Sequence, residues 1–524
     1  MVNLPPPRAP RIRTRVALTL LAAAVGLLTC TCQPRASTAA RPGIRPPAVA
    51  GQFYPKDPGP LRAAVQAYLE HAVARRGGRP IALVLPHAGY PYSGQIAADG
   101  WRQVQGEDYD LVVILGTHHT VGDFGGAAVY PGTGFATPLG VMEVDTAAAA
   151  AWRAADPAVS ADPAPHQGEH SIEVHVPFAQ VVLPRAKLLP VVVGTEDPAI
   201  CERLGRSLAR VLAGRRVLLV ASSDLSHYPD YDVAVASDRA VLAAIARLDP
   251  AGLHRTIAAQ MGAGRAGLET CACGEGGVLV AMEAAKGLGA NRGMVISCAN
   301  SGDTPVGDRS RVVGYGAAEL AAGDAGADTG ALDRSAPAAA GAELGLEDKR
   351  QLLQLARRTL QQWFESGTVP LPRGFSPVAS RNQGAFVTLL QRGQLRGCIG
   401  HMAEDLPLDQ VVATMALAAA FEDPRFSPLQ AGELADVEIE ISALTPLERV
   451  SGPEAVVIGR DGVQIRKDGR VGVFLPQVPV EQGWDRPALM ENLSLKAGLP
   501  RDAWQQGAEF YTFRSVMFRE SEFR

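Results

Sequence analysis

Residues 81–94, which read IALVLPHAGYPYSG, decide the fold of the first half of this chain. Five apolar residues without alternation are followed by Pro86, His87 and a glycine-containing turn. A short apolar run bounded by turn residues is typical of a strand buried on both faces, as in a parallel sheet between helices. His87 then follows the carboxyl end of the strand, where open α/β sheets bind their ligands.

Two later stretches repeat this pattern. LVVIL at 111–115 precedes GTHH at 116–119, and VLLVA at 217–221 precedes SSDLSH at 222–227. Three predicted strands therefore bring imidazoles to one edge of one sheet, and this predicts a functional site at that edge. Helix-compatible segments lie between these strands, and further strands are expected at 187–194, 294–297 and 312–319. The alternation predicts a layered α/β/α domain with a mostly parallel sheet over residues 48–322.

The histidines at these strand ends are candidate metal ligands. Seven of the ten histidines fall between Pro86 and His227. Two imidazoles and one anionic ligand on one face of a metal form the arrangement of non-haem iron sites, with positions left open for substrate. The candidate histidines are His87, His118 and His227. The candidates for the anionic ligand are Glu169, Asp224 and Cys273, and spacing alone leaves the choice open.

Cys273 lies in a loop before the predicted helix 276–286. The positive end of the helix dipole favours a thiolate there, which is the form that binds metals. Cys271 is two residues away, and we interpret it as a small buried residue.

The N-terminus has the layout of an export signal. Four arginines precede an apolar segment at 16–28, and Thr29 and Cys30 follow it. This segment is short for a membrane span, and residues 27–30 resemble a bacterial lipoprotein box with lipidation at Cys30. We therefore expect a signal over residues 1–32, a tether over 33–47, and a periplasmic or lipid-anchored protein. The protein would be cytoplasmic if the signal does not function.

Composition excludes some classes of protein. A net charge of −4 offers no basic surface for nucleic acid. Seven cysteines are too few and too scattered for a disulfide framework.

The second half of the chain begins after a stretch of small and polar residues, which predicts a flexible linker over 323–343. Residues 344–524 show a helix at 346–364, a hairpin at 385–399, a second helix at 406–421 and an alternating strand at 437–444. These elements predict an α+β domain. We also expect the two domains to fold independently, with metal only in the first.

Six motifs of the first domain resemble the Memo family, whose fold is similar to LigB-like class III extradiol dioxygenases. They are PHAGYPYSG (86–94), GTHH (116–119), GEHSIEVHVPF (168–178), SSDLSH (222–227), TCACGEGG (270–277) and VVGYGAAE (312–319). The resemblance covers nearly all of the first domain. It implies the same layered fold and a metal site at the sheet edge.

Site residues follow from this resemblance. It implies that His87 and His118 are the two metal histidines and that Cys273 is the thiolate ligand. It also places Asp224 and His227 beside the metal, where His227 would exchange a proton and Asp224 would orient it. Related dioxygenases use a carboxylate in place of the thiolate. The pattern of two imidazoles and one anion makes iron the expected metal, and copper and zinc are alternatives because sulfur also suits them.

The second domain resembles the AMMECR-type domain through LRGCIG (395–400), EDPRFSPL (422–429), EISALTP (440–446) and LPQVPVEQGW (475–484). Cys398 lies between two glycines, where a nucleophile would be accessible. His401 is the only histidine of this domain, so we favour a structural cysteine.

Both resemblances together are those of AmmeMemoRadiSam system protein B fused to protein A. They imply a radical SAM protein as a partner. We predict a metal-dependent oxidoreductase that acts on an unknown small molecule or peptide. Two alternatives remain: a scaffold that holds metal or peptide without turnover, and a zinc-dependent hydrolase.

Overall fold

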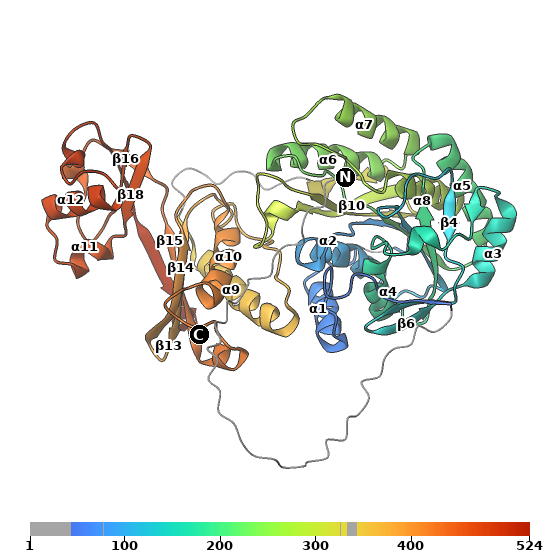
Figure 1. Cartoon of the computed structure of the whole chain (residues 1–524), viewed down its shortest axis with the longest axis horizontal. Coiled ribbons are helices and arrows are strands. Elements are labelled where there is room, and N and C mark those ends of the chain that lie inside the picture. Colours follow the sequence, from blue (N-terminus) through green and yellow to red (C-terminus); the bar gives the residue numbers. More distant parts are fainter. Residues whose placement is uncertain (1–42, 77, 325, 333–342, 524) are drawn as a thin grey trace, which may run out of the picture.

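The structure is a computed structural model that describes residues 43–76, 78–324, 326–332 and 343–523 (Figure 1). The predicted signal and most of the predicted tether lie outside the described residues. Two domains lie side by side, with the larger N-terminal one built on a single large sheet. Within the described residues, no helix is both long enough and apolar enough to span a membrane.

The first domain contains a nine-stranded sheet with the order β12-β10-β11-β2-β9-β3-β8-β4-β7. The four central strands run parallel, whereas β11 is antiparallel to both of its neighbours. The strands are β2 (Pro80–Leu85), β3 (Leu111–Gly116), β4 (Ala127–Val129), β7 (Val159–Ser160), β8 (Lys187–Val193), β9 (Val217–Ser222), β10 (Arg292–Asn300), β11 (Gly314–Ala321) and β12 (Gly326–Asp328). The predicted mostly parallel α/β domain is therefore confirmed.

Helices cover both faces of this sheet (Figure 1). Alternate residues of β3 belong to two different cores: Val113 packs on one face and Val112 and Ile114 pack on the other. The helices of the first face are α3 (Thr146–Ala155), α5 (Pro198–Leu212), α6 (Tyr231–Ala246), α7 (Pro250–Gly262) and α8 (Glu275–Gly287). Those of the second face are α1 (Pro58–Glu70), α2 (Tyr90–Gln103) and α4 (Val176–Val182). Burial on both faces explains why the strands are apolar without alternation.

The strand register places the site loops together. Leu85 at the end of β2 pairs with Ser222, and Leu115 near the end of β3 pairs with Ala221. The loops after β2, β3 and β9 therefore leave the sheet at one edge. Gly274 lets the start of α8 approach this edge, because a Cβ there would lie 2.3 Å from the Ser222 carbonyl oxygen.

The chain enters the fold earlier than predicted. The strand β1 (Ile44–Arg45), which falls in the predicted tether, pairs with β5 (Gly134–Thr137), and β5 pairs with β6 (Gly140–Glu143). The buried guanidinium of Arg45 pairs with Glu173 at 2.5 Å. A partner 128 residues away leaves no local pattern, so the sequence prediction missed this contact.

The predicted linker also contributes to the first domain. The strand β12 adds to the sheet in parallel with β10. The turn η4 (Gly330–Leu332) follows, and the side chain of Leu332 is buried in the core. All three residues of β12 are exposed, so the strand has no apolar signature. The rest of the predicted linker, at 333–342, lies outside the described residues.

The second domain consists of two antiparallel sheets with helices, which confirms the α+β prediction. The helix α9 (Leu346–Ser366) and the helix α10 (Leu408–Phe421) pack on the sheet β14-β13-β15-β20. Its strands are β13 (Ala385–Gln391), β14 (Gln394–His401), β15 (Val437–Leu444) and β20 (Ser515–Arg519). The second sheet comprises β16 (Glu448–Val450), β17 (Gly462–Lys467), β18 (Arg470–Phe474) and β19 (Glu509–Phe513), with α11 (Gln477–Glu481) and α12 (Arg486–Lys496).

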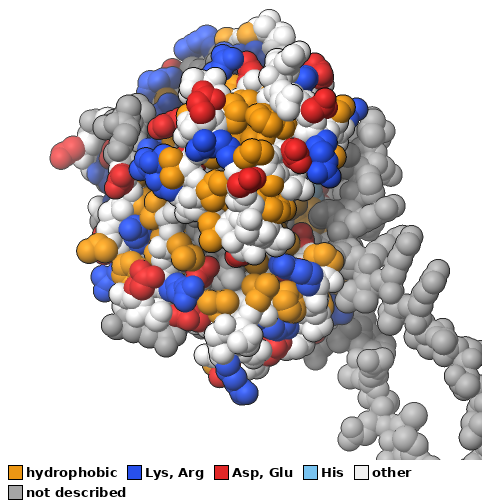
Figure 2. All heavy atoms as spheres, turned by 90° about the vertical axis from the view of Figure 1, so that its left-hand side faces the viewer, with side chains coloured by type: hydrophobic (Ala, Val, Ile, Leu, Met, Phe, Trp, Pro, Cys, Tyr) orange, Lys and Arg blue, Asp and Glu red, His pale blue; other side chains and the backbone are white. Residues whose placement is uncertain are grey.

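The end of the molecule formed by this second sheet carries charges of both signs among apolar side chains (Figure 2). Val471, Val480 and Leu495 are among its exposed apolar residues. Interspersed charges of this kind are typical of an ordinary solvated surface.

Specific contacts join the two domains, although we expected them to be independent. Arg373 of the second domain donates a hydrogen bond of 2.8 Å to the carboxylate of Asp99 on α2, which is fully buried. The Gln410 side chain donates to the Gly302 carbonyl at 2.7 Å, and the Thr414 hydroxyl donates to the Pro305 carbonyl at 3.2 Å. The fully buried clusters of the two domains are nevertheless separate, although Leu371 of the second domain packs against a cluster of the first.

Candidate metal centre

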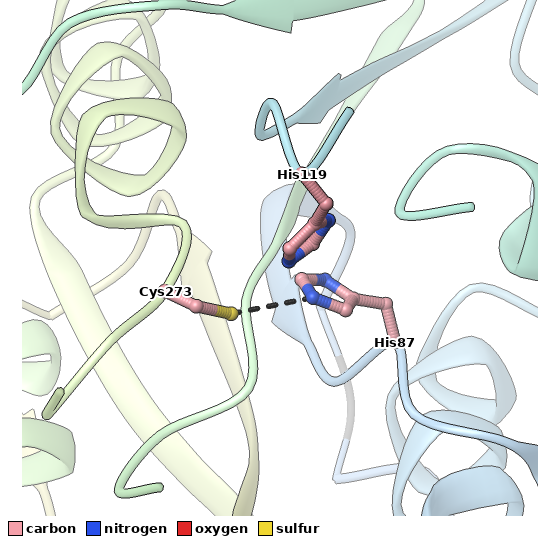
Figure 3. Close-up of side chains that lie close together, drawn as sticks. All are labelled: His87, His119 and Cys273. Carbon is pink, nitrogen blue, oxygen red and sulfur yellow. Dashed lines mark hydrogen bonds between the residues drawn. The ribbon is translucent and has the colours of Figure 1, made fainter. Parts of the chain in front are cut away.

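His87 lies at the centre of the site, in the turn between β2 and α2. Its side chain is 1% exposed. Its backbone N–H donates to Asp224 Oδ1 at 2.7 Å, and its Nδ1 lies 2.8 Å from Ser222 Oγ. Its Nε2 lies 3.2 Å from the Sγ of Cys273 (Figure 3). Burial and neighbouring histidines, His119 first among them, hold the pKa of His87 well below its usual range, so the ring is neutral.

His119 follows β3 and faces His87, with the two ring centroids 5.1 Å apart (Figure 3). Its Nδ1 lies 2.9 Å from Glu169 Oε1, and its backbone N–H donates to Glu169 Oε2 at 2.7 Å. Because the carboxylate only accepts hydrogen bonds, Nδ1 carries the proton. The lone pair of Nε2 is then left for a metal.

His118 was the predicted ligand, but the structure brings His119 to the cluster instead. The Nδ1 of His118 lies 3.4 Å from the Val121 carbonyl oxygen, and its Nε2 lies 3.6 Å from Asp123 Oδ1. Successive side chains of an extended segment point in opposite directions. A His-His pair therefore offers one ring to the site, and the sequence does not say which.

Cys273 reaches the site from the loop before α8, as predicted. Burial, followed by the nearby carboxylate of Asp224, raises the pKa of the Cys273 thiol well above its usual range. These effects outweigh the helix dipole, from which we expected a thiolate. The thiol is therefore protonated in the metal-free protein, and a metal must displace that proton to bind sulfur.

Together, His87, His119 and Cys273 offer two nitrogens and one sulfur within 4.8 Å of one another (Figure 3). These donors fit a transition metal that accepts both imidazole and thiolate ligands. A second group of three, His119, Glu169 and His170, meets the same distance limit. We assign it a supporting role, since Glu169 is already hydrogen-bonded to His119.

Glu169 was a candidate anionic ligand, and the structure places it behind His119. Oε1 of its carboxylate accepts the backbone N–H groups of His170 at 2.9 Å and Ser171 at 2.8 Å. Burial alone would raise the pKa of Glu169, but the hydrogen bond and charge of His119 and the charge of His170 lower it to about 2. Arg45 donates to the Glu169 carbonyl at 2.6 Å and so holds this loop in place. Glu169 therefore orients a ligand as a carboxylate.

Asp224 and His227 flank the cluster. Asp224 Oδ1 accepts the N–H groups of His87 and Ala88, and burial raises the pKa of Asp224 to about 6. Burial lowers the pKa of His227 to about 4, and its buried Nε2 has no hydrogen-bond partner among the described residues. No hydrogen bond joins Asp224 to His227 within that part of the chain. Their roles in proton transfer remain predictions.

A pocket of about 380 Å³ opens beside the cluster. Its wall includes His118, His119, Cys273, Asp123 and Glu196. His118 thus faces the space next to the donor atoms. Small polar molecules fit a pocket of this size and lining.

Two buried residues of the site were missed by the sequence analysis. Ser222 and His175 lie next to His87 and are both fully buried. Both are part of the motifs quoted above, but nothing in a motif distinguishes a ligand from the residue behind it. Cys271 is buried and lies 3.3 Å from the Ser237 hydroxyl, so its interpretation as a small buried residue is confirmed.

In the second domain, hydrogen bonds and ion pairs engage Cys398, His401 and the nearby Arg396. The backbone N–H of Cys398 donates to Asp423 at 2.8 Å, and the Thr388 hydroxyl donates to its Sγ at 3.2 Å. His401 pairs with Asp405 at 2.5 Å, and Arg396 pairs with Glu433 at 2.9 Å. Among the described residues, the groups of metal-binding side chains lie in the first domain.

Comparison with known proteins identifies both halves of the chain. The model of the Memo-like protein family matches residues 45–319, which is more than half of the chain. The chain belongs to the Memo family. The AMMECR1 family model matches residues 353–518, so this Memo-like domain is followed by an AMMECR1 domain.

Curated relatives of this chain include proteins of the MEMO1 family. A MEMO1 family protein of Desulfurococcus amylolyticus is 35% identical over 288 residues, which cover 52% of this chain and 97% of the relative. A MEMO1 family protein of Ignicoccus hospitalis is 34% identical over 290 residues, covering 53% and 98%. Among solved structures, an uncharacterized protein of Pyrococcus horikoshii is 35% identical and covers 33% of this chain and 92% of its own, with a TM-score of 0.30.

Proposed function

We propose that this Memo-family protein is a metal-dependent oxidoreductase that holds iron through His87, His119 and Cys273. The convergence of these three donors beside an open polar pocket carries the proposal. Two imidazoles and one anionic ligand on one side of a metal leave other positions open for substrate and oxidant, as in non-haem iron sites. Iron bound there would supply one-electron and oxygen chemistry.

The chain's own residues would bind substrate and move protons. His118, Asp123 and Glu196 on the pocket wall would bind polar groups of a small molecule or peptide. His227 has a buried Nε2 with no hydrogen-bond partner among the described residues, so it would exchange a proton there. Asp224 is the second candidate for proton transfer, because its pKa of about 6 lies close to physiological pH.

Three further assignments are proposals from the sequence. The arginine-rich start and the apolar segment at 16–28 support export, with Cys30 as a lipid attachment site. If Cys30 is lipidated, Cys30→Ser should release the protein into the soluble fraction. The Memo and AMMECR1 pair supports a radical SAM protein as a partner.

The test requires no known substrate. Protein purified without added metal is analysed for its metal content, then loaded anaerobically with Fe(II) or with Zn(II). Nitric oxide, a probe for open positions on Fe(II), should give an electron paramagnetic resonance signal in the iron form, and His119→Ala should abolish it. The oxidoreductase proposal would be overturned if the iron form failed to bind nitric oxide. It would also be overturned if the zinc form hydrolysed esters or amides while the iron form took up no oxygen. The latter result would establish a zinc hydrolase.

A further inference from the structure

Ser222 is the centre of a buried hydrogen-bond network behind His87. Its Oγ lies 2.6 Å from the Ser171 carbonyl oxygen, 2.8 Å from His87 Nδ1 and 3.1 Å from His175 Nε2. All four residues are buried. In such surroundings each polar hydrogen atom needs an acceptor, because a buried polar group without a hydrogen-bond partner is destabilising.

The direction of these hydrogen bonds follows from the chemistry of the partners. A carbonyl oxygen only accepts, so the one proton of the Ser222 hydroxyl lies toward Ser171. The serine oxygen then has two lone pairs left for the two ring nitrogens. His87 Nδ1 and His175 Nε2 must therefore both donate to it.

Trp101 fixes the other end of the network. Its indole N–H, which can only donate, lies 3.4 Å from His175 Nδ1. That nitrogen must accept, so the single proton of the neutral His175 ring is on Nε2. This is the arrangement that Ser222 requires, and each hydrogen atom of the network has one acceptor.

We infer that Ser222, with His175 and Trp101 behind it, is a positioning residue that holds His87 as the tautomer protonated on Nδ1. The lone pair of Nε2 is then directed toward the Sγ of Cys273, 3.2 Å away. Both atoms would hold the metal. Glu169 does the same for His119 through a charged carboxylate. The Nδ1 of His87 is instead held by a network of neutral groups. The inference rests on the proposed function only in taking His87 as a metal ligand.

The test uses Ser222→Ala in the full chain, with Ser207→Ala as a matched control. Ser207 is also a buried serine that accepts an indole N–H, from Trp152 at 2.9 Å, and donates to a carbonyl, that of Leu204, at 2.9 Å. It lies on α5, away from the site. Nitrogen NMR of ¹⁵N-histidine-labelled, metal-free protein reports the tautomer of His87, and competition with a chromophoric chelator reports the affinity for Zn(II).

We expect wild type and Ser207→Ala to carry the His87 proton on Nδ1 and to agree in affinity within about twofold. Ser222→Ala should lose this tautomer preference and bind Zn(II) about 10–100-fold more weakly, the usual effect of removing a partner of a metal ligand. A wild-type proton on Nε2, or a Ser222→Ala protein unchanged in both measurements, would overturn the inference.

A second pair of variants covers the case that Ser222→Ala does not fold. In His175→Gln, the side-chain oxygen accepts from Trp101 and the amide donates to Ser222, so tautomer and affinity should be retained. His175→Leu can do neither, and its affinity should fall by about tenfold. Equal affinities for the two would overturn the inference. If wild type binds no metal while its His87 tautomer still depends on Ser222, the positioning role stands and the proposed function fails.

Discussion

The two domains both place a cysteine and a histidine near acidic side chains, but they use these groups differently. In the Memo-like domain, His87, His119 and Cys273 direct their free donor atoms at one another. In the AMMECR1 domain, the charged groups around Cys398 are paired, as Asp423 is with Arg425. Among the described residues, this cluster of imidazole and thiol groups has no counterpart in the second domain. The comparison therefore supports placing the proposed metal site in the first domain.

Two carboxyl groups, one in each domain, show opposite shifts in pKa. Burial raises the pKa of Asp238 in the first domain to about 7. In the second domain, the guanidinium of Arg425 beside Asp423 holds the pKa of that carboxyl well below its usual range. Neither behaviour is confined to one domain, because the pKa of Glu169 in the first domain is lowered and burial raises that of Asp409 in the second.

The largest expected effect is a loss of metal affinity, which we expect to depend on residues of the first domain. Replacing His87, His119 or Cys273 with alanine should each lower metal affinity at least about a hundredfold, since loss of a ligand exceeds the 10–100-fold effect of losing its partners. Equilibrium dialysis with Zn(II) measures this, and circular dichroism checks the fold. His118→Ala should change the affinity less than about threefold. If it matches His119→Ala instead, His118 is a ligand and the assignment to His119 is wrong.

The pH dependence of stability should also differ. Asp238 has a pKa of about 7 when folded against 3.8 when unfolded, so the native state binds the extra proton and stability falls as pH rises from about 4 to 7. Asp238→Asn keeps an acceptor for the Ser226 N–H and removes this loss. Between pH 5 and pH 8, wild type should lose about 2–3 kcal/mol more than the variant, at about 1.4 kcal/mol per pKa unit.

Urea unfolding at both pH values measures that difference. Asp423→Asn is the control. The pKa of Asp423 is lowered in the folded protein, so its contribution to stability is lost only as pH falls below about 4, outside the range from pH 5 to pH 8. Identical pH profiles for wild type and Asp238→Asn would show that Asp238 is not protonated in the native state.

A smaller effect tests how far the domains depend on each other. Arg373→Ala leaves the buried Asp99 carboxylate without its cation, although the Val73 N–H and the Ser297 hydroxyl still donate to it. Breaking a buried pair costs about 3–5 kcal/mol, and since the Arg373 side chain is 27% exposed we expect about 2–3 kcal/mol. Thermal unfolding measures the loss. Arg350→Ala, which breaks an exposed pair with Glu347, should cost less than about 0.5 kcal/mol. Equal effects would mean that the domains are energetically independent, as the sequence led us to expect.

The smallest expected effect concerns Cys398. Cys398→Ala removes a partly buried thiol that accepts one hydrogen bond, so we expect less than about 1 kcal/mol of destabilisation and no change in metal content. Chemical denaturation and metal analysis test this. Loss of a catalytic activity in this variant, with stability retained, would instead identify Cys398 as a nucleophile.

Local patterns were enough to predict the elements that position the site. The runs at 81–85, 111–115 and 217–221 correspond to β2, β3 and β9, and their carboxyl ends meet at one edge as expected. These strands are buried on both faces, so their composition alone distinguishes them. The short edge strands β1 and β12 gave no such signal, because long-range pairing stabilises them rather than their own side chains.

The sequence by itself determined the layered first domain and the α+β second domain, and it made His87 and Cys273 candidate ligands. Periodicity and motif order are properties of neighbouring residues, so one chain suffices to show them. Only the tertiary structure chose His119 over His118, placed Glu169 and Ser222 behind the two rings, and paired Arg373 with Asp99. These choices depend on side-chain direction and on contacts between residues as many as 274 positions apart, and no local pattern encodes them.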